Sequence, residues 1–146
     1  MTGADVMSVF GILNLNLDDY FSEDVILFFL QQWPEGQFVA TDYRGEIIGA
    51  LCSARLEPSR ASISLLAVDS QYRGTGVGSS LMNYFDRVCM MNGIGTTQLE
   101  VRVTNSNAIG FYQKRGYRIT ETLPSFYNDG GAGYRMVRSS GPFSPS

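Results

Sequence analysis

Apolar residues in the first part of the chain recur with the spacing of helices. Within residues 4–17 they fall three or four positions apart, at Val6, Val9, Phe10 and Leu13. They therefore share one face of an amphipathic helix. A second helix is predicted over residues 22–33, with Ser22 as its N-cap and Pro34 closing it. Two helices thus precede the first predicted strand.

From residue 37 onwards the apolar period changes to two, which is typical of strands. Residues 37–43 and 46–56 are predicted to pair as an antiparallel hairpin around the turn at residues 44–45, and a third strand follows over 60–69. Further helices are predicted over 76–93 and 105–116, and further strands over 96–104, 117–124 and 133–139. This order predicts a mixed sheet covered by helices.

The third predicted strand contains an irregularity in its alternation. Ile63 and Leu65 share one face, but the apolar pattern continues on the other face with Leu66 and Val68. An extra residue in a β-bulge produces such a change of phase, because it turns every later side chain to the other face. A regular strand that is buried on both faces explains the pattern equally well.

Composition restricts the class of protein. The chain has 146 residues, of which 44% are hydrophobic, and its net charge is −3. We expect one domain over residues 1–138 and a disordered tail over 139–146. The sequence lacks the ~20 consecutive apolar residues of a membrane span and the features of a secretory signal, so a cytoplasmic protein without membrane contact is expected. Its arginines are scattered, which argues against nucleic-acid binding.

Reactive side chains are few. Cys52 and Cys89 lie in apolar runs without the spacing of a metal site or a redox pair, so both are predicted to be buried free thiols. Histidine is absent, which removes the commonest general base and the commonest metal ligand. Acid and base chemistry would fall to carboxylates, tyrosines or an unusual lysine or cysteine, and no metal site is expected.

A glycine-rich segment, "RGTGVGSS" at residues 73–80, leads into the helix predicted over 76–93. It lacks the lysine of a P-loop and the GxGxxG spacing of a dinucleotide-binding turn. Successive N–H groups at the start of a helix can still bind an anion without a lysine. The segment therefore indicates either an anion site or a turn that only joins a strand to a helix.

Two motifs carry a family resemblance. "YRGTGVGSSLM" resembles the pyrophosphate loop of the GCN5-related N-acetyltransferases, and "LEVRVTNSNAIGFYQKRGY" resembles the second signature of that family. Residues 16–40 and 125–136 further resemble the catalytic subunits of protein N-terminal acetyltransferases and the bacterial ribosomal-protein alanine acetyltransferases. The resemblance implies an α+β fold (an α/β sandwich) with a mixed, mostly antiparallel sheet flanked by helices. The first strand of that fold is missing or shortened here.

The resemblance also implies acetyl-CoA as co-substrate and places it on particular residues. The diphosphate would lie against the backbone of Arg73, Gly74, Gly76, Val77 and Gly78. The pantetheine arm would pair with the strand at Leu66 and Val68, as an added strand does. Asn105 would contact the cofactor, although a plain helix cap would look the same in the sequence.

Catalytic and substrate residues follow from the same resemblance. Tyr112 would bind the cofactor and protonate its departing sulfur; the alternative for Tyr112 is a core aromatic. Glu100 would act as the base through water; the alternative for Glu100 is a solvent-facing carboxylate. Asp19, Phe21 and Tyr127 would line the peptide groove, unless they only pack loops. The chain departs from these relatives at two places. The eukaryotic relatives carry a histidine at the strand position where this chain has Ser62. The segment "GGAG" at residues 130–133 replaces an acidic stretch that is common in this subgroup.

The function implied is acetylation of the N-terminal α-amine of proteins or peptides by direct attack in a ternary complex. An acetyltransferase for small amines and a catalytically silent acyl-CoA-binding module are the alternatives. The resemblance leaves open association with a ribosome or an auxiliary subunit, and a homodimer.

Overall fold

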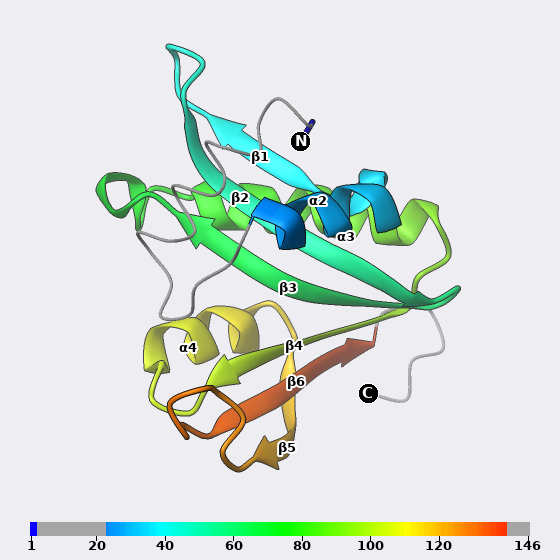
Figure 1. Ribbon diagram of the computed structural model, residues 1–146, viewed down its shortest axis with the longest axis vertical. Helices are drawn as coiled ribbons and strands as arrows, with labels where there is room; N and C mark the ends of the chain where they lie inside the picture. Colours follow the sequence, from blue (N-terminus) through cyan, green and yellow to red (C-terminus); the bar gives the residue numbers. More distant parts are fainter. Residues whose placement is uncertain (3–22, 140–146) are drawn as a thin grey trace.

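The computed structural model describes residues 1–2 and 23–139, and Figure 1 shows their arrangement. Within this described part of the chain, six strands form one sheet in the order β1-β2-β3-β4-β6-β5. Their bounds are Phe38–Thr41 for β1, Ile47–Glu57 for β2, Arg60–Val68 for β3, Thr96–Arg102 for β4, Arg118–Leu123 for β5 and Gly133–Ser139 for β6. Only β3 and β4 run parallel, and the other neighbours are antiparallel. The mixed, mostly antiparallel sheet is confirmed.

Helices cover both faces of this sheet. Their bounds are Glu23–Gln32 for α2, Val77–Met91 for α3 and Ser106–Lys114 for α4, and short 3-10 turns lie at Pro34–Gly36 (η2) and Ser70–Tyr72 (η3). Figure 1 shows α2 and α3 on opposite sides of β2 and β3. The expected helix over residues 4–17, the cap Ser22 and residues 140–146 lie outside the described residues. Strand β6 ends at Ser139, the first residue of the expected tail.

Two apolar clusters hold these layers together. Phe85 of α3 and Tyr112 of α4 belong to one cluster, which also contains Leu99 of β4. Phe29 of α2 belongs to the other, with Cys52 of β2. Both cysteines are buried free thiols, as expected, and burial raises the pKa of each to about 12, so they stay protonated at neutral pH. In the described part of the chain, no helix is long and apolar enough to cross a membrane.

A β-bulge lies in the middle of β3. Cys52 pairs with Leu65 and Ser53 pairs with Ile63, so Ser64 is the extra residue. Before the bulge, Ile63 packs in the cluster with α3, and after it Leu65 packs in the cluster with α2. The change of face confirms the bulge as the reason for the irregular alternation.

The bulge lies where β3 separates from β4. Their parallel pairing ends at Ile63 and Leu99, although β3 continues to Val68 and β4 to Arg102. Figure 1 shows β3 and β4 diverging toward their C-terminal ends. The sheet therefore opens next to Glu100, the residue that follows the last pair.

Candidate active site

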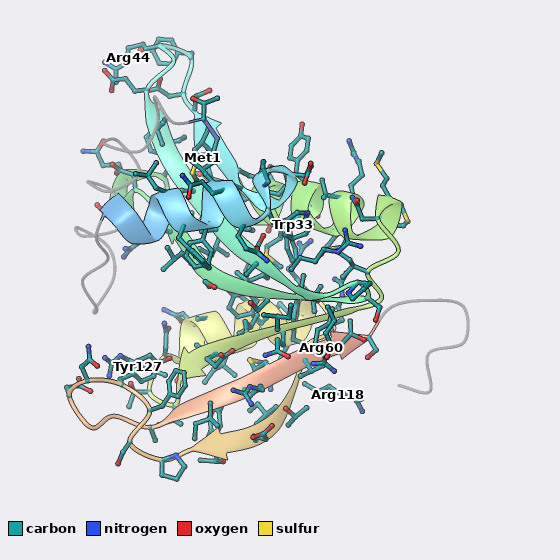
Figure 2. All side chains as sticks on the ribbon, turned by 45° about the vertical axis from the view of Figure 1, so that its right-hand side comes forward. Met1, Trp33, Arg44, Arg60, Arg118 and Tyr127 are labelled. Carbon is teal, nitrogen blue, oxygen red and sulfur yellow. The ribbon has the colours of Figure 1, made fainter. Side chains whose placement is uncertain are left out.

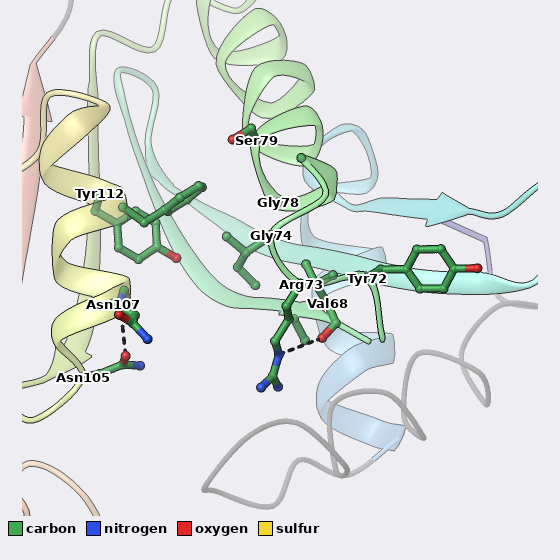
Figure 3. Close-up of a pocket in the computed structure, with 14 residues that line it drawn as sticks. Val68, Tyr72, Arg73, Gly74, Gly78, Ser79, Asn105, Asn107 and Tyr112 are labelled. Atoms are coloured by element: carbon green, nitrogen blue, oxygen red, sulfur yellow. Dashed lines mark hydrogen bonds between the residues drawn. The ribbon is translucent and has the colours of Figure 1, made fainter. Parts of the chain in front are cut away.

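A cavity of about 670 Å³ lies beside the opening between β3 and β4, against the glycine loop and α4 (Figure 3). It is lined by eight of the nine residues that the sequence analysis assigned to the cofactor: Leu66, Val68, Arg73, Gly74, Gly76, Gly78, Asn105 and Tyr112. Val77 is the exception, because its side chain packs against the core cluster of α3. Only the backbone of Val77 remains a candidate for the cofactor.

The glycines of the loop have different reasons to be glycine. Gly74 and Gly76 adopt left-handed conformations, with φ of +78° and +92°, so the turn itself requires them. Gly78 lies inside α3, and a Cβ there would meet Phe111 Cζ and Val68 Cγ2 at 3.8 Å, which is ordinary van der Waals contact. Gly78 is therefore the glycine that the fold itself does not require.

The start of α3 suits an anion. Gly76 is the N-cap and no side chain caps the helix, whose first turn contains no acidic residue. The backbone N–H groups of this turn carry the positive end of the helix dipole. Arg73 precedes them, and its Nε donates a hydrogen bond to the Val68 carbonyl oxygen at 3.4 Å. Gly76 and Gly78 bring this positively polarised backbone to the cavity wall.

Helix α4 forms the facing wall. Asn105 is its N-cap, and its side-chain oxygen accepts a hydrogen bond from the Ala108 N–H at 3.2 Å, so the helix-cap reading is confirmed while the residue also lines the cavity. Tyr112 is 8% exposed, and Figure 3 shows its hydroxyl pointing into the space between α4 and the glycine loop. Among the described residues, no hydrogen bond engages that hydroxyl.

Burial, and next to it Tyr117, raise the pKa of Tyr112 above that of a free tyrosine. The phenol therefore keeps its proton at neutral pH and can act as a donor toward a group in the cavity.

Glu100 lies on the other face of β4. Leu99 and Val101 point into the core, and Glu100 points away from it, because successive side chains of a strand alternate. Its side chain is 25% exposed, and Oε1 lies 3.9 Å from Arg135 Nη2 on β6. Burial raises the pKa of Glu100, Arg135 lowers it and Glu121 raises it. The effect of burial is the largest, so the pKa of Glu100 is raised overall and its carboxylate is a stronger base than that of a free glutamate.

Tyr127 lies in the loop between β5 and β6, and its ring centroid is 4.1 Å from Arg102 Cζ. Arg102 follows Glu100 by two positions on the regular strand β4, so both side chains leave the same face of the sheet. The structure therefore brings Tyr127 to the face that bears Glu100. Asp19 and Phe21, the other predicted groove residues, lie outside the described residues.

The sequence analysis missed several residues of this region. Ser79, which follows Gly78, and Phe111, which precedes Tyr112, line the cavity. Tyr72 and Asn107 line it as well. All four lie within the two motifs quoted above, so their place in those motifs could have indicated them.

The site thus combines three features with distinct chemistry. A helix start that suits an anion and a protonated phenol line the cavity, and a carboxylate with a raised pKa lies across β4 where the sheet opens. Within residues 1–2 and 23–139, no three cysteine or acidic side chains lie close enough together to hold a metal ion.

The chain matches the model of the acetyltransferase (GNAT) family over residues 9–117. N-alpha-acetyltransferase 30 of Schizosaccharomyces pombe is 29% identical over 129 residues, covering 86% of each chain. The crystal structure of Ard1 from Thermoplasma volcanium is 36% identical, with a TM-score of 0.92 over 95% of this chain and 93% of that one.

Arabidopsis thaliana Naa50, solved with the bisubstrate analogue CoA-Ac-MVNAL, is 25% identical, with a TM-score of 0.85 over 96% of this chain and 95% of that one. The family match, the order of strands in the described sheet and the position of the cavity all point to the same family. The chain belongs to the acetyltransferase (GNAT) family, whose co-substrate is acetyl-CoA.

Proposed function

We propose that this protein transfers the acetyl group of acetyl-CoA to the N-terminal α-amine of a protein or peptide. The observation that carries the proposal is the opening between β3 and β4, which has the cavity and Tyr112 on one side and Glu100 on the other. Its relatives named N-alpha-acetyltransferase give the acceptor class.

The cofactor would lie along the cavity. Its diphosphate would accept hydrogen bonds from the backbone at the start of α3, between Arg73 and Gly78. Beyond Ile63, β3 no longer pairs with β4. The backbone at Leu66 and Val68 can therefore pair with the pantetheine amides on that side. The thioester would then lie where the strands part, within reach of both faces of the sheet.

The residues would divide the chemistry as follows. Glu100 takes a proton from the acceptor ammonium, directly or through water, and the neutral amine attacks the thioester carbonyl carbon. As the carbon–nitrogen bond forms and the carbon–sulfur bond breaks, Tyr112 gives its proton to the departing sulfur. The new amide nitrogen then loses its extra proton, which returns to the Tyr112 oxygen directly or through water and restores the phenol. The raised pKa of Glu100 makes its carboxylate a stronger base, and the raised pKa of Tyr112 keeps a proton on the phenol that can be donated.

Proton affinity favours an α-amine as acceptor. Its pKa lies near 7.7–8.0, about 2.5 units below the 10.4 of a lysine side chain. At pH 7 the neutral fraction of an α-amine is therefore several hundred times larger, which suits a single carboxylate base that has no histidine beside it. Tyr127, with Asp19 and Phe21, would contact the first residues of the peptide. We further propose a cytoplasmic location and contact with a ribosome, an auxiliary subunit or a second copy.

The test compares three acceptors in the presence of acetyl-CoA, with mass spectrometry as the readout. They are a peptide with a free N-terminus, the same peptide blocked there but carrying an internal lysine, and a polyamine. We expect the free N-terminus to be acetylated fastest. Faster acetylation of the polyamine would instead make the protein a small-amine acetyltransferase. Acetyl-CoA binding without any transfer would make it an acyl-CoA-binding module.

A further inference from the structure

The loop between β5 and β6, residues 124–132, is built around one arginine of β4. Both carboxylate oxygens of Asp129 accept hydrogen bonds from Arg102 Nη1, at 3.1 Å each. The same guanidinium lies over the ring of Tyr127, with Cζ 4.1 Å from the ring centroid. Arg102 therefore contacts an acidic and an aromatic side chain of the loop at once.

The glycines near the end of this loop fit these contacts. A Cβ on Gly131 would lie 2.7 Å from Arg102 Nη1, and a Cβ on Gly133 would lie 3.2 Å from Tyr127 Cε2. Gly130 has a φ of +86°, which other residues rarely adopt. The segment "GGAG" thus leaves room for the guanidinium of Arg102 and the ring of Tyr127. Gly130 also permits the turn of the loop before Gly131.

Backbone hydrogen bonds close the loop on itself and onto β4. The Gly131 N–H donates to Asp129 Oδ1 at 2.9 Å, and the Tyr127 N–H donates to the Gly131 carbonyl oxygen at 3.1 Å. The Val103 N–H donates to the Ala132 carbonyl oxygen at 3.1 Å. The hydrogen bonds from Gly131 and Arg102 lower the pKa of Asp129, so its carboxylate stays charged at neutral pH.

Arg102 differs from an ordinary surface partner in an ion pair. Its side chain is 16% exposed, whereas that of Asp129 is 64% exposed. An exposed ion pair contributes little by itself, but a flat guanidinium can bind a carboxylate and stack on an aromatic ring together, which an ammonium group cannot do. A lysine at this position could not reproduce both contacts of Arg102, with Asp129 and with the ring of Tyr127.

We propose that Arg102 is a positioning residue for the acceptor: it holds Tyr127 and the loop 124–132 ordered on the sheet face that bears Glu100. This inference rests on the proposed function, because it assigns the acceptor to that face. If the loop is already ordered, binding of the acceptor does not cost the free energy of ordering it. The affinity for the acceptor is higher for that reason. Arg102 acts through Tyr127 and takes no part in the chemical step.

The test replaces Arg102 by lysine, which keeps the charge but loses the flat, forked group. Arg60→Lys is the matched control, because Arg60 donates to Gln98 Oε1 on the same face, and Figure 2 shows Arg60 and Tyr127 near opposite ends of this part of the sheet. Asp129→Asn removes the charge partner and leaves the stacked ring. Thermal unfolding first establishes that each variant is folded.

For Arg102→Lys we expect the KM for the peptide to rise about tenfold, with kcat and the acetyl-CoA Kd within about twofold of wild type. Amide hydrogen exchange at Tyr127 and Gly131 should accelerate in Arg102→Lys, less so in Asp129→Asn and not in Arg60→Lys. An unchanged peptide KM with unchanged exchange overturns the proposal. A fall in kcat at constant KM also overturns it, because it would place Arg102 in the chemical step.

The two proposals fail in different ways. If wild-type protein acetylates none of the peptides, the proposed function fails. The exchange experiment needs no turnover, so it still decides whether Arg102 orders this loop.

Discussion

Replacing Gly78 by alanine should stabilise the fold and weaken cofactor binding at the same time. Gly78 is the second residue of α3, and an added Cβ would have only ordinary contacts, 3.8 Å from Phe111 Cζ and Val68 Cγ2. Both of those residues line the cavity, as Gly78 does. The new methyl group therefore projects into the space assigned to the diphosphate, without a clash inside the protein.

The two effects can be estimated separately. Alanine is favoured over glycine in a helix by about 0.5–1 kcal/mol, which should raise Tm by roughly 1–4 °C for a domain of this size. A hydrogen bond to a charged group contributes about 1.5–3 kcal/mol. Loss of one backbone contact to the diphosphate should therefore weaken acetyl-CoA binding by about 10–100-fold.

Calorimetric titration with acetyl-CoA and thermal unfolding of the unliganded protein measure the two quantities. Gly110→Ala is the matched control, because Gly110 lies inside α4, has nothing within 4 Å of an added Cβ and is not among the residues that line the cavity. It should raise Tm similarly and leave affinity unchanged. Wild-type affinity in a folded Gly78→Ala variant would refute the assignment of the diphosphate to this backbone.

Three further predictions concern Glu100 and Tyr112, the proposed base and acid. Glu100→Gln should keep acetyl-CoA affinity and lower kcat by about 10²-fold or more, and wild-type turnover would place the base elsewhere. Because burial raises the pKa of Glu100 above its ordinary value of 4.5, folding stability should fall as pH rises through the interval between these two values. Urea unfolding from pH 4 to 7 should therefore show Glu100→Gln gaining stability relative to wild type, and a constant difference would contradict the raised pKa. Tyr112→Phe should reduce kcat at neutral pH less than Glu100→Gln does, because a thiol with a pKa near 8.5 leaves tolerably as its anion; an equal or larger loss, measured by steady-state kinetics, would contradict this order.

Local sequence signals were sufficient for the secondary structure after residue 22. Apolar periods and end signals such as caps and glycines predicted every strand and α-helix of the described chain to within a few residues at either end, because both follow from local backbone geometry. The short 3-10 turns η2 and η3 were not predicted. The irregular alternation around Ser64 fitted either a bulge or a strand buried on both faces, and the strand pairing showed the bulge. The motifs at Gly74–Gly78 and Asn105–Tyr112 were visible as short runs, and the family resemblance that they carry predicted part of the cavity lining.

The arrangement of the site depended on the path of the whole chain. No local sequence pattern indicates that β3 and β4 pair only as far as Ile63 and Leu99. The end of this pairing nevertheless places the opening of the sheet next to Glu100. Arg102 and Asp129 are 27 residues apart in sequence, and their contact forms only when β6 pairs with β4 and carries the loop back. The sequence by itself thus determined the elements and the residue types of the chemistry, because helix and strand periods and short motifs are encoded by near neighbours. The tertiary structure decided which side chains meet on which face, because that depends on strand pairing between segments far apart in the chain.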